Sequence, residues 1–431
     1  MDRTFIKDVG KHDKEKIVLK GWVYNKRSSG KIWCLILRDG TGVIQCTVLS
    51  NEVTEEVFAM RDILTQESSV EISGIVRADK RAPGGFEITV QDIRIVQISE
   101  EYPISLKEHG PDFLLSNRHL WIRSKKQWAL LRLRHSVYYA ICDYLNQNGF
   151  IRFDSPILTP NACEGTTTLF SVPYFDLGSA FLSQSGQLYL ETGIMSFDRV
   201  YDFGPVFRAE KSKTRKHLTE FWMMDAEAAF VEHDENMKIQ EELIRFVIRV
   251  VIEKNTEDLE ILERDMESLK AADAPFTRMT HAEAVAYLQS RGSKIGDKDD
   301  LGASDETLLL ENSTVPIFVE RWPKETKAFY MKRDPENSDL VLGADLIAPE
   351  GFGEIIGGIQ REDDHDILLG RMQDEEMPIE PYQWYLDLRK YGSVPHSGFG
   401  IGLERLVGWM AGVRHIREAI PFPRTIYRLE P

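Results

Sequence analysis

Residues 397–405 read Ser-Gly-Phe-Gly-Ile-Gly-Leu-Glu-Arg, and this stretch indicates what kind of sheet the chain builds. Glycines alternate with bulky apolar residues, and successive side chains of a strand point to opposite faces. Gly398, Gly400 and Gly402 therefore share one bare face, against which a flat ligand can lie. We expect a helix to begin next, with Arg405 in its first turn. The spacing is not Gly-x-Gly-x-x-Gly, which excludes a Rossmann motif; a tight crossing of strands is the alternative.

A second polar stretch, residues 207–227, predicts a hairpin of two strands joined by a basic loop. Residues 207–217 carry five basic side chains and one acidic one. A guanidinium such as Arg208 suits a phosphate undergoing displacement, because it neutralises charge on the phosphate oxygens. Phe221 offers an aromatic face for a purine. For the lysines of the loop, a solvated surface hairpin is the favoured interpretation.

A third stretch, Gly353-Glu-Ile-Ile-Gly-Gly-Ile-Gln-Arg361, has Asp345 upstream. Asp345 and Glu354 could hold Mg²⁺ on a nucleotide, and Arg361 could bind a polar ligand group. Buried pairing between arginine and glutamate accounts for the pattern equally well.

The N-terminal part predicts a small barrel. Short strands separated by turn residues are expected at 16–24, 32–38, 43–49, 70–76 and 86–98, with a helical stretch near 52–62. Five strands with one helix between the third and fourth match an OB-fold. A generic β domain is the alternative.

The rest of the chain predicts an α+β domain on an antiparallel sheet, because the regular strand–helix alternation of a doubly wound parallel sheet is missing. We expect three parts: an OB-fold at 1–100, a hinge at 101–122 and a catalytic domain at 123–431. Within the last part, we expect a long helix at 124–148, short strands and turns at 150–230, and a mostly helical segment at 233–291. A polar acidic loop at 292–314, strands at 315–320 and 328–331, and helices at 377–390 and 403–412 are expected after it.

Composition excludes several classes of protein. The longest apolar runs are too short for a membrane helix, and the first residues lack the apolar core of a signal peptide. The four cysteines are far apart and form no Cys-x-x-Cys pair, which argues against a zinc ribbon or a disulfide framework. We therefore expect a cytoplasmic protein.

The formal net charge of −16 argues against a nucleic-acid partner only if its distribution is ignored. Residues 1–100 hold 15 basic and 15 acidic side chains, whereas residues 231–320 hold 10 basic and 21 acidic ones. An acidic body with local basic contacts can still bind a polyanion, and we expect the acidic segment to face away from it.

Taken in order, these stretches resemble the class II aminoacyl-tRNA synthetases. Residues 149–160 resemble motif 1, residues 207–227 motif 2 and residues 398–405 motif 3. With an OB-fold in front, the chain is similar to the aspartyl, asparaginyl and lysyl subgroup. Stretches that resemble the bacterial asparaginyl members are 182–189, 208–215, 327–330 and 353–358.

This resemblance implies ATP-dependent joining of L-asparagine to tRNA(Asn) through an aminoacyl-adenylate, with AMP and pyrophosphate released. It also implies a homodimer whose two-fold interface includes residues 149–160. Positioning and charge neutralisation perform the catalysis, without a protein nucleophile.

The resemblance also implies roles for single residues. Arg208, Arg405 and Glu354 are the expected catalytic residues, and Glu354 and Asp345 the expected Mg²⁺ ligands. Residues expected to bind ATP are Arg208, Glu210, Arg215, His217, Phe221, Asp345, Glu354, Gly402 and Arg405. Residues expected around the amino acid are Glu164, Gln187, Leu190, Asp225 and Arg361. Residues expected to read the anticodon are Arg27, Trp33 and Gln45.

The choice of amino acid rests on Leu190 and Asp225. Aspartyl enzymes place a lysine at the position of Leu190, so its loss disfavours a carboxylate and suits an amide. Arg361 can donate to the amide oxygen. Asparaginyl enzymes usually supply a glutamate as acceptor for the amide nitrogen, where this chain has Asp225. Ile359 is a second departure, since serine is usual there.

The anticodon reading has one open point. The usual stacking phenylalanine is Cys34 here, and strand alternation places the neighbouring Trp33 on the opposite face. Either a bulge turns Trp33 toward the base, or the stack is weak.

Three other functions remain open from the sequence. The chain could be an aspartyl enzyme, including one that charges both tRNAs. It could be a paralogue that makes asparagine without tRNA, although such paralogues lack the OB-fold. It could be a non-catalytic protein on this scaffold, although such a protein would have lost Arg208 and Arg405.

Overall fold

The computed structural model describes residues 2–105, 107–163, 168–211 and 217–431. Contacts divide the chain into two compact units, Met1–Pro111 and Asp112–Pro431. The segment 101–122, predicted as a hinge, contains two short helices, α2 (Pro111–Ser116) and α3 (Arg118–Trp121).

The first unit is a closed five-stranded barrel, as the sequence predicted. The strand order is β1-β2-β3-β5-β4, and only β3 and β5 pair in parallel. Helix α1 stands between the third and fourth strands along the chain, and Thr54 caps it by accepting from the amide of Val57. The elements are η1 (Ile6–His12), β1 (Lys16–Ser29), β2 (Ile32–Arg38), β3 (Val43–Leu49), α1 (Glu55–Ile63), β4 (Ser69–Ala78), η2 (Pro83–Gly85) and β5 (Phe86–Gln97).

Strand β2 keeps a strict alternation, which decides the position of Trp33. Its pairings with β1 and β3 run from Ile32 to Arg38 without a shift in β2. Trp33 is only 1% exposed and lies in the barrel core, while Cys34 faces outward next to Thr47. The expectation that Trp33 reads the anticodon is therefore corrected, because no bulge turns its side chain out of the core; of the two alternatives, the weak stack is left.

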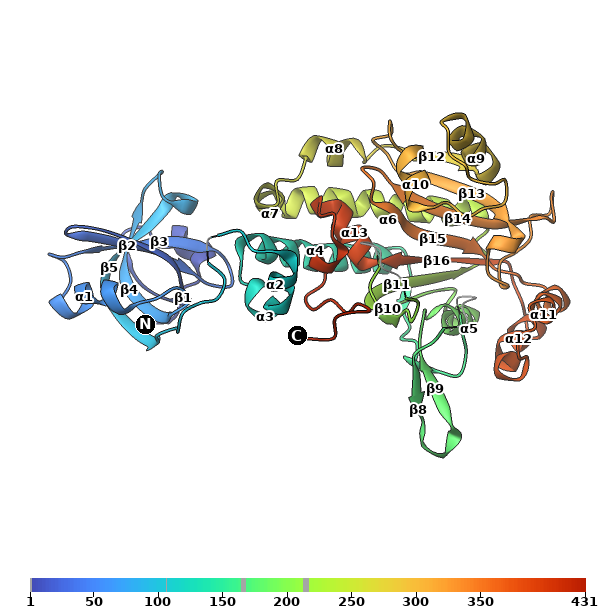
Figure 1. Ribbon diagram of the computed structural model, residues 1–431, viewed down its shortest axis with the longest axis horizontal. Helices are drawn as coiled ribbons and strands as arrows, with labels where there is room; N and C mark the ends of the chain where they lie inside the picture. Colours follow the sequence, from blue (N-terminus) through green and yellow to red (C-terminus); the bar gives the residue numbers. More distant parts are fainter. Residues whose placement is uncertain (1, 106, 164–167, 212–216) are drawn as a thin grey trace. The chain divides into compact units, whose positions relative to one another are not determined.

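The second unit is built on an eight-stranded sheet (Figure 1). The order is β12-β13-β14-β15-β16-β11-β10-β6; the six central strands are antiparallel, and the strand at each edge is parallel to its neighbour. A separate three-stranded sheet has the order β7-β9-β8. The strands are β6 (Ile151–Arg152), β7 (Leu158–Thr159), β8 (Ser171–Pro173), β9 (Ser179–Leu182), β10 (Arg199–Phe207), β11 (Glu220–Ala229), β12 (Thr277–Thr280), β13 (Ile317–Pro323), β14 (Leu340–Ala348), β15 (Gly353–Gln360) and β16 (His396–Gly402).

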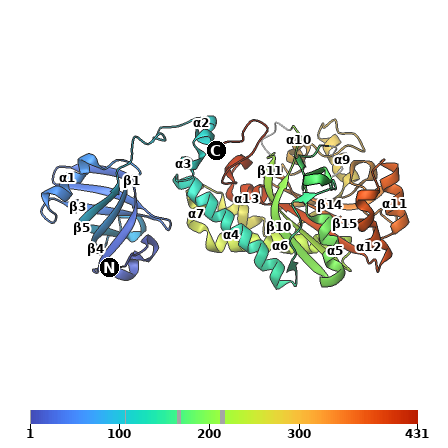
Figure 2. The same cartoon turned by 90° about the horizontal axis from the view of Figure 1, so that it is seen from below.

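Helices α4, α6 and α13 cover one face of this sheet (Figure 2) and enclose the main core. The side chains of Phe399 and Ile401 in β16 enter this core from the sheet, which leaves the glycines of β16 on the other face. The helices of the unit after α3 are α4 (Lys125–Gln147), η3 (Phe175–Leu177), α5 (Gln187–Phe197), α6 (His233–Lys254), α7 (Thr256–Ile261), α8 (Met266–Ala271), α9 (His281–Ser290), α10 (Ala303–Leu309), η4 (Lys324–Thr326), α11 (His365–Asp374), η5 (Glu380–Tyr382), α12 (Gln383–Lys390), α13 (Leu403–Ala411) and η6 (Ile416–Glu418).

Helix α4 ends where its sequence predicts. Ser124 caps its N-terminus by accepting from the amide of Gln127. Gly149 follows its last residues with a φ of +80°, a conformation that glycine adopts without a Cβ penalty.

Four local predictions differ from the structure. Helix α5 replaces expected strands, because it is apolar on most sides and shows little helical periodicity. Helix α10 lies within the expected acidic loop, and α11 was not predicted. Residues 328–331 form a single bridge from Met331 to Arg361 rather than a strand.

The position of Trp33 predicts how the barrel responds to mutation. Trp33→Ala removes a large buried side chain and should cost about 3–5 kcal/mol of stability. Denaturant unfolding, followed by circular dichroism, measures this; Cys34→Ser is the matched control and should cost less than about 1 kcal/mol. A Trp33→Ala protein as stable as the wild type would contradict the buried position of Trp33.

Candidate active site

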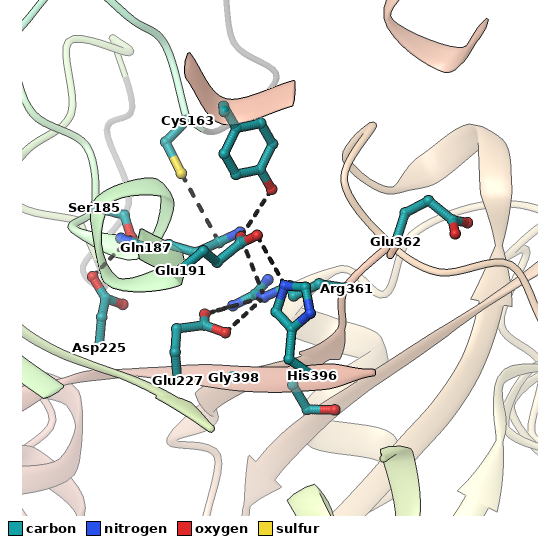
Figure 3. Close-up of polar contacts among 12 residues, drawn as sticks. Cys163, Ser185, Gln187, Glu191, Asp225, Glu227, Arg361, Glu362, His396 and Gly398 are labelled. Atoms are coloured by element: carbon teal, nitrogen blue, oxygen red, sulfur yellow. Dashed lines mark hydrogen bonds and ion pairs between the residues drawn. The ribbon is translucent and has the colours of Figure 1, made fainter. Parts of the chain in front are cut away.

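The site lies on the bare face of β16. In the register of the sheet, Gly398 stands opposite Glu227 and Gly400 opposite Asp225, both on β11. A Cβ on Gly398 would lie 2.0 Å from Glu227 Oε1, and one on Gly400 would lie 2.6 Å from Asp225 Oδ1. The glycines therefore leave room for two carboxylates that turn over the strand, as Figure 3 shows for Glu227 and Gly398. The predicted alternation is confirmed.

Arg361 and Glu227 form a buried ion pair at one end of the bare face of β16. Arg361 Nε donates to Glu227 Oε1 at 3.1 Å, and Nη2 donates to the same oxygen; both residues are no more than 2% exposed. Burial acts to raise the pKa of the Glu227 carboxyl, whereas the Arg361 guanidinium in direct contact acts to lower it and keeps the ionised form paired. Arg361 Nη1 is buried and has no hydrogen-bond partner among the described residues, so one donor remains for a ligand.

Asp225 has a different role in this geometry. Its Oδ2 accepts from Ser185 Oγ at 2.7 Å and from the Gly186 amide at 2.9 Å, and so fixes the turn that leads into α5. Asp202 lies directly opposite on β10. Burial, with the charge of Asp225, raises the pKa of Asp202 to about 8.

Helix α5 supplies Gln187 and, one turn later, Glu191. Gln187 Nε2 donates to Glu191 Oε1 at 3.2 Å, and Cys163 Sγ lies 3.9 Å from Gln187 Oε1 (Figure 3). Leu190 is fully buried in a cluster with Ile194, Val200 and Ala229. The prediction that Leu190 lines the amino-acid site is corrected accordingly, since its side chain contacts apolar neighbours. Glu164 lies outside the described residues.

A second group of charges lies where phosphates are expected. The guanidinium of Arg208 stands 5.4 Å from the ring centre of Phe221, and its Nη1 donates to the carbonyl of Gln184. Arg405 Nη1 donates to Glu354 at the carbonyl (2.9 Å) and at Oε2 (3.2 Å). The structure thus brings Arg208 to Phe221 and Arg405 to Glu354.

Asp345 and Glu354 converge across β14 and β15. A Cβ on Gly357 would lie 3.5 Å from Glu354 Oε1 and 3.8 Å from Asp345 Oδ1. Burial and the charge of Glu354 raise the pKa of Asp345 to about 6, although Lys327, whose Nζ lies 2.7 Å from Asp345 Oδ2, opposes the shift. Burial raises the pKa of Glu354, but Arg405 and Lys327 bring it below its ordinary value.

The remaining predicted nucleotide ligands are partly placed. Glu210 Oε1 is buried and lacks a hydrogen-bond partner among the described residues, so it is able to accept from a ligand. His217 is exposed, and Gly402 ends β16 at the start of α13. Arg215 lies outside the described residues.

On the barrel, Arg27 and Gln45 form one polar face. Arg27 Nη2 donates to Gln45 Oε1 at 2.9 Å, and Gln45 Nε2 donates to Glu87 Oε2 at 3.0 Å. Thr47 Oγ1 donates to the same oxygen at 2.9 Å. This cluster of hydrogen-bonding groups lies on the outer surface.

Three residues of the candidate site, Glu191, Glu227 and His396, were not predicted from the sequence. Glu227 stands two residues after Asp225 on one strand, so strand alternation already placed both on one face. Glu191 and His396 gave no such signal, since α5 was not predicted and a single histidine before a glycine-rich strand has no specific meaning.

Comparison with known families matches both units. Residues 110–426 match the model of tRNA synthetases class II (D, K and N), and residues 17–96 match that of the OB-fold nucleic acid binding domain. Within the described part of the chain, none of the helices is long and apolar enough to cross a membrane.

Individual proteins match over the whole chain. The asparagine--tRNA ligase of Desulforamulus reducens is 53% identical over 431 residues, covering all of both chains, and that of Thermus thermophilus is 51% identical over 441 residues with the same coverage. The crystal structure of asparaginyl-tRNA synthetase from Pyrococcus horikoshii complexed with asparaginyl-adenylate has a TM-score of 0.97 at 45% identity, covering all of both chains.

Because Gly398 leaves room for the Glu227 carboxylate, adding one methyl group at this position should strongly reduce activity. Gly398→Ala places a Cβ against the Glu227 carboxylate, which must then leave Arg361, so ATP–pyrophosphate exchange should fall about 100-fold or more. Gly370→Ala in α11, where a Cβ meets nothing within 4 Å, is the control and should leave exchange intact. Full activity of Gly398→Ala, with an unchanged melting temperature, would contradict the placement of Glu227.

Proposed function

The chain belongs to the class II tRNA synthetases of the aspartate, lysine and asparagine group, and we propose that it is an asparagine–tRNA ligase that uses ATP. The observation that carries this function is identity of 51–53% with asparagine--tRNA ligases over the whole chain. The arrangement of charges around Arg361 supports an uncharged amide as the substrate side chain.

In the first step, the carboxylate of asparagine attacks the α-phosphate of ATP and pyrophosphate leaves. Arg208 binds the α-phosphate, where a fixed guanidinium neutralises the charge that develops on its oxygens. Phe221 stacks on adenine, and Arg405 contributes to binding from its other side. His217 and Arg215 stabilise the outer phosphates.

Recognition of the side chain rests on Arg361. Its unpartnered Nη1 donates to the amide oxygen, which leaves the amide nitrogen in need of an acceptor. Asp225 and Glu227 are the buried carboxylates on the same face, two residues apart. Gln187 and Glu164 hold the backbone groups of the amino acid.

In the second step, the ribose hydroxyl at the 3′ end of tRNA(Asn) attacks the adenylate and AMP leaves. The outer face of the barrel, with Arg27 and Gln45, reads the anticodon by hydrogen bonds, since stacking by Trp33 is excluded. Two copies form a homodimer through residues 149–160, where Ile157 and Leu158 are 44% and 42% exposed. The four cysteines are thiols, which fits the cytoplasm.

Magnesium fits the two carboxylates of the site. Across the described residues, no cluster of three or more His, Cys, Asp or Glu side chains forms a metal site. Asp345 and Glu354 supply hard oxygen donors of the kind that Mg²⁺ shares with nucleotide phosphates. When bound, the ion neutralises charge on the phosphates.

ATP–pyrophosphate exchange with each amino acid tests the function directly. Exchange should depend on asparagine and be at least about tenfold weaker with aspartate at equal concentration, because Glu227 and Glu191 face the Arg361 guanidinium and offset its charge. Arg208→Ala should reduce asparagine-dependent exchange by about 100-fold or more. Exchange with aspartate but not asparagine would sink the proposal and favour an aspartyl enzyme.

The raised pKa of Asp345 predicts a dependence on pH. The carboxylate that binds Mg²⁺ is lost as the pH falls through about 6, so the Mg²⁺ concentration for half-maximal exchange should rise in that range. Asp345→Asn should need more Mg²⁺ at neutral pH and show a flatter dependence. If wild type and Asp345→Asn need the same Mg²⁺ at every pH, Asp345 is not a ligand.

A further inference from the structure

Glu191 joins the amino-acid site to a helix outside it. The residue is fully buried in α5, and both carboxylate oxygens are occupied. Oε1 accepts from Gln187 Nε2 at 3.2 Å and from the Tyr385 hydroxyl at 2.8 Å. Oε2 accepts from Arg389 Nη2 at 2.6 Å and lies 3.1 Å from His396 Nε2. One carboxylate therefore holds side chains from α5, α12 and β16.

The same carboxylate acts on Arg361. Glu191 Oε1 lies 3.9 Å from Arg361 Nε, so the guanidinium stands between Glu191 and Glu227. Figure 3 shows Gln187, Glu191, Glu227 and Arg361 gathered around one point. A charge at this distance in a buried place acts strongly on the potential at Arg361, because little water screens it.

The charges of this cluster are retained in spite of burial. Burial raises the pKa of the Glu191 carboxyl, but Arg389 and His396 hold it below its usual range. His396 Nδ1 lies 2.8 Å from the carbonyl of Val394, and its Nε2 faces Glu191, so both ring nitrogens are held in place. Glu191 is thus the counter-charge of Arg389 as well as of Arg361.

We propose that Glu191 is a positioning residue that determines specificity: with Glu227, it offsets the positive charge at Arg361, so that the site donates a hydrogen bond to an amide without attracting a carboxylate. This inference rests on the proposed function. Arg389 and Tyr385 of α12, which lie outside the expected substrate contacts, act through Glu191. The site needs the Arg361 guanidinium as a hydrogen-bond donor, while Glu191 and Glu227 offset its positive charge. Aspartate is therefore not attracted to the site.

Glu191→Gln tests the proposal, because it removes the charge and preserves the shape. The measured quantity is the ratio of kcat/KM for asparagine to that for aspartate in ATP–pyrophosphate exchange. The ratio should fall by about tenfold or more, with KM for aspartate lowered, since the excess positive potential then attracts a carboxylate. Glu191→Asp, which keeps the charge, should lower both rates but keep the ratio.

Two further variants separate charge from structure. Glu362→Gln removes another buried carboxylate, which stands apart from the cluster in Figure 3 and faces Lys332 at 3.6 Å; it should leave the ratio unchanged. Glu191→Gln combined with Arg389→Met removes one charge of each sign and should restore most of the ratio.

The outcomes are distinct. If Glu191→Gln lowers both activities equally and the ratio stays constant, Glu191 is structural only and the proposal is overturned. The proposal also fails if Glu362→Gln changes the ratio as much. Failure of the function itself would show earlier, as wild-type protein that does not exchange with asparagine.

Discussion

The buried ion pair between Arg361 and Glu227 is the interaction on which the rest of the site depends. Burying an ionised side chain costs free energy, and such a side chain remains ionised only where its ion-pair geometry and hydrogen bonds are favourable. Three adjacent strands, β15, β16 and β11, provide that geometry by aligning Gly398 with Glu227. The absence of a side chain at Gly398 is therefore a condition for the ion pair, since any Cβ there would occupy the place of the carboxylate.

The fold followed from patterns whose physical cause is local. Alternation of glycine with apolar residues predicted which face of β16 is bare, and the barrel strands were predicted by turns and β-branched residues. The same alternation already argued against stacking by Trp33, and the structure agrees. The sequence could not show which distant residues come into contact. Glu191 and Arg389 are far apart in the chain, and no local pattern indicates that they form a buried ion pair.

The success of the role predictions does not follow the type of element, since Gln187 of α5 was predicted whereas Glu191 of α5 and Glu227 of β11 were missed. Asp225 and Glu227 differ in role although they lie on one face, because Asp225 is bound to the turn before α5 while Glu227 reaches Arg361. The roles of the two carboxylates differ because of the geometry of the turn before α5, which the sequence pattern does not reveal. Helix α5 was not predicted because apolar residues lie on most of its sides. For that reason Glu191, which links Gln187 to the rest of the cluster, was not predicted either.

The two ends of the site treat charge in opposite ways. At the phosphate end, Arg208 and Arg405 are only partly buried, so their charge is available to a polyanion. At the amino-acid end, the guanidinium groups of Arg361 and Arg389 each face a glutamate, and among the described residues the Nη1 group of Arg361 is left to donate to the ligand. A hydrogen bond is sensitive to direction, whereas a net charge attracts any carboxylate at similar distance. Cancelling the charge while keeping the donor therefore converts a site that would prefer an acid into one that reads an amide.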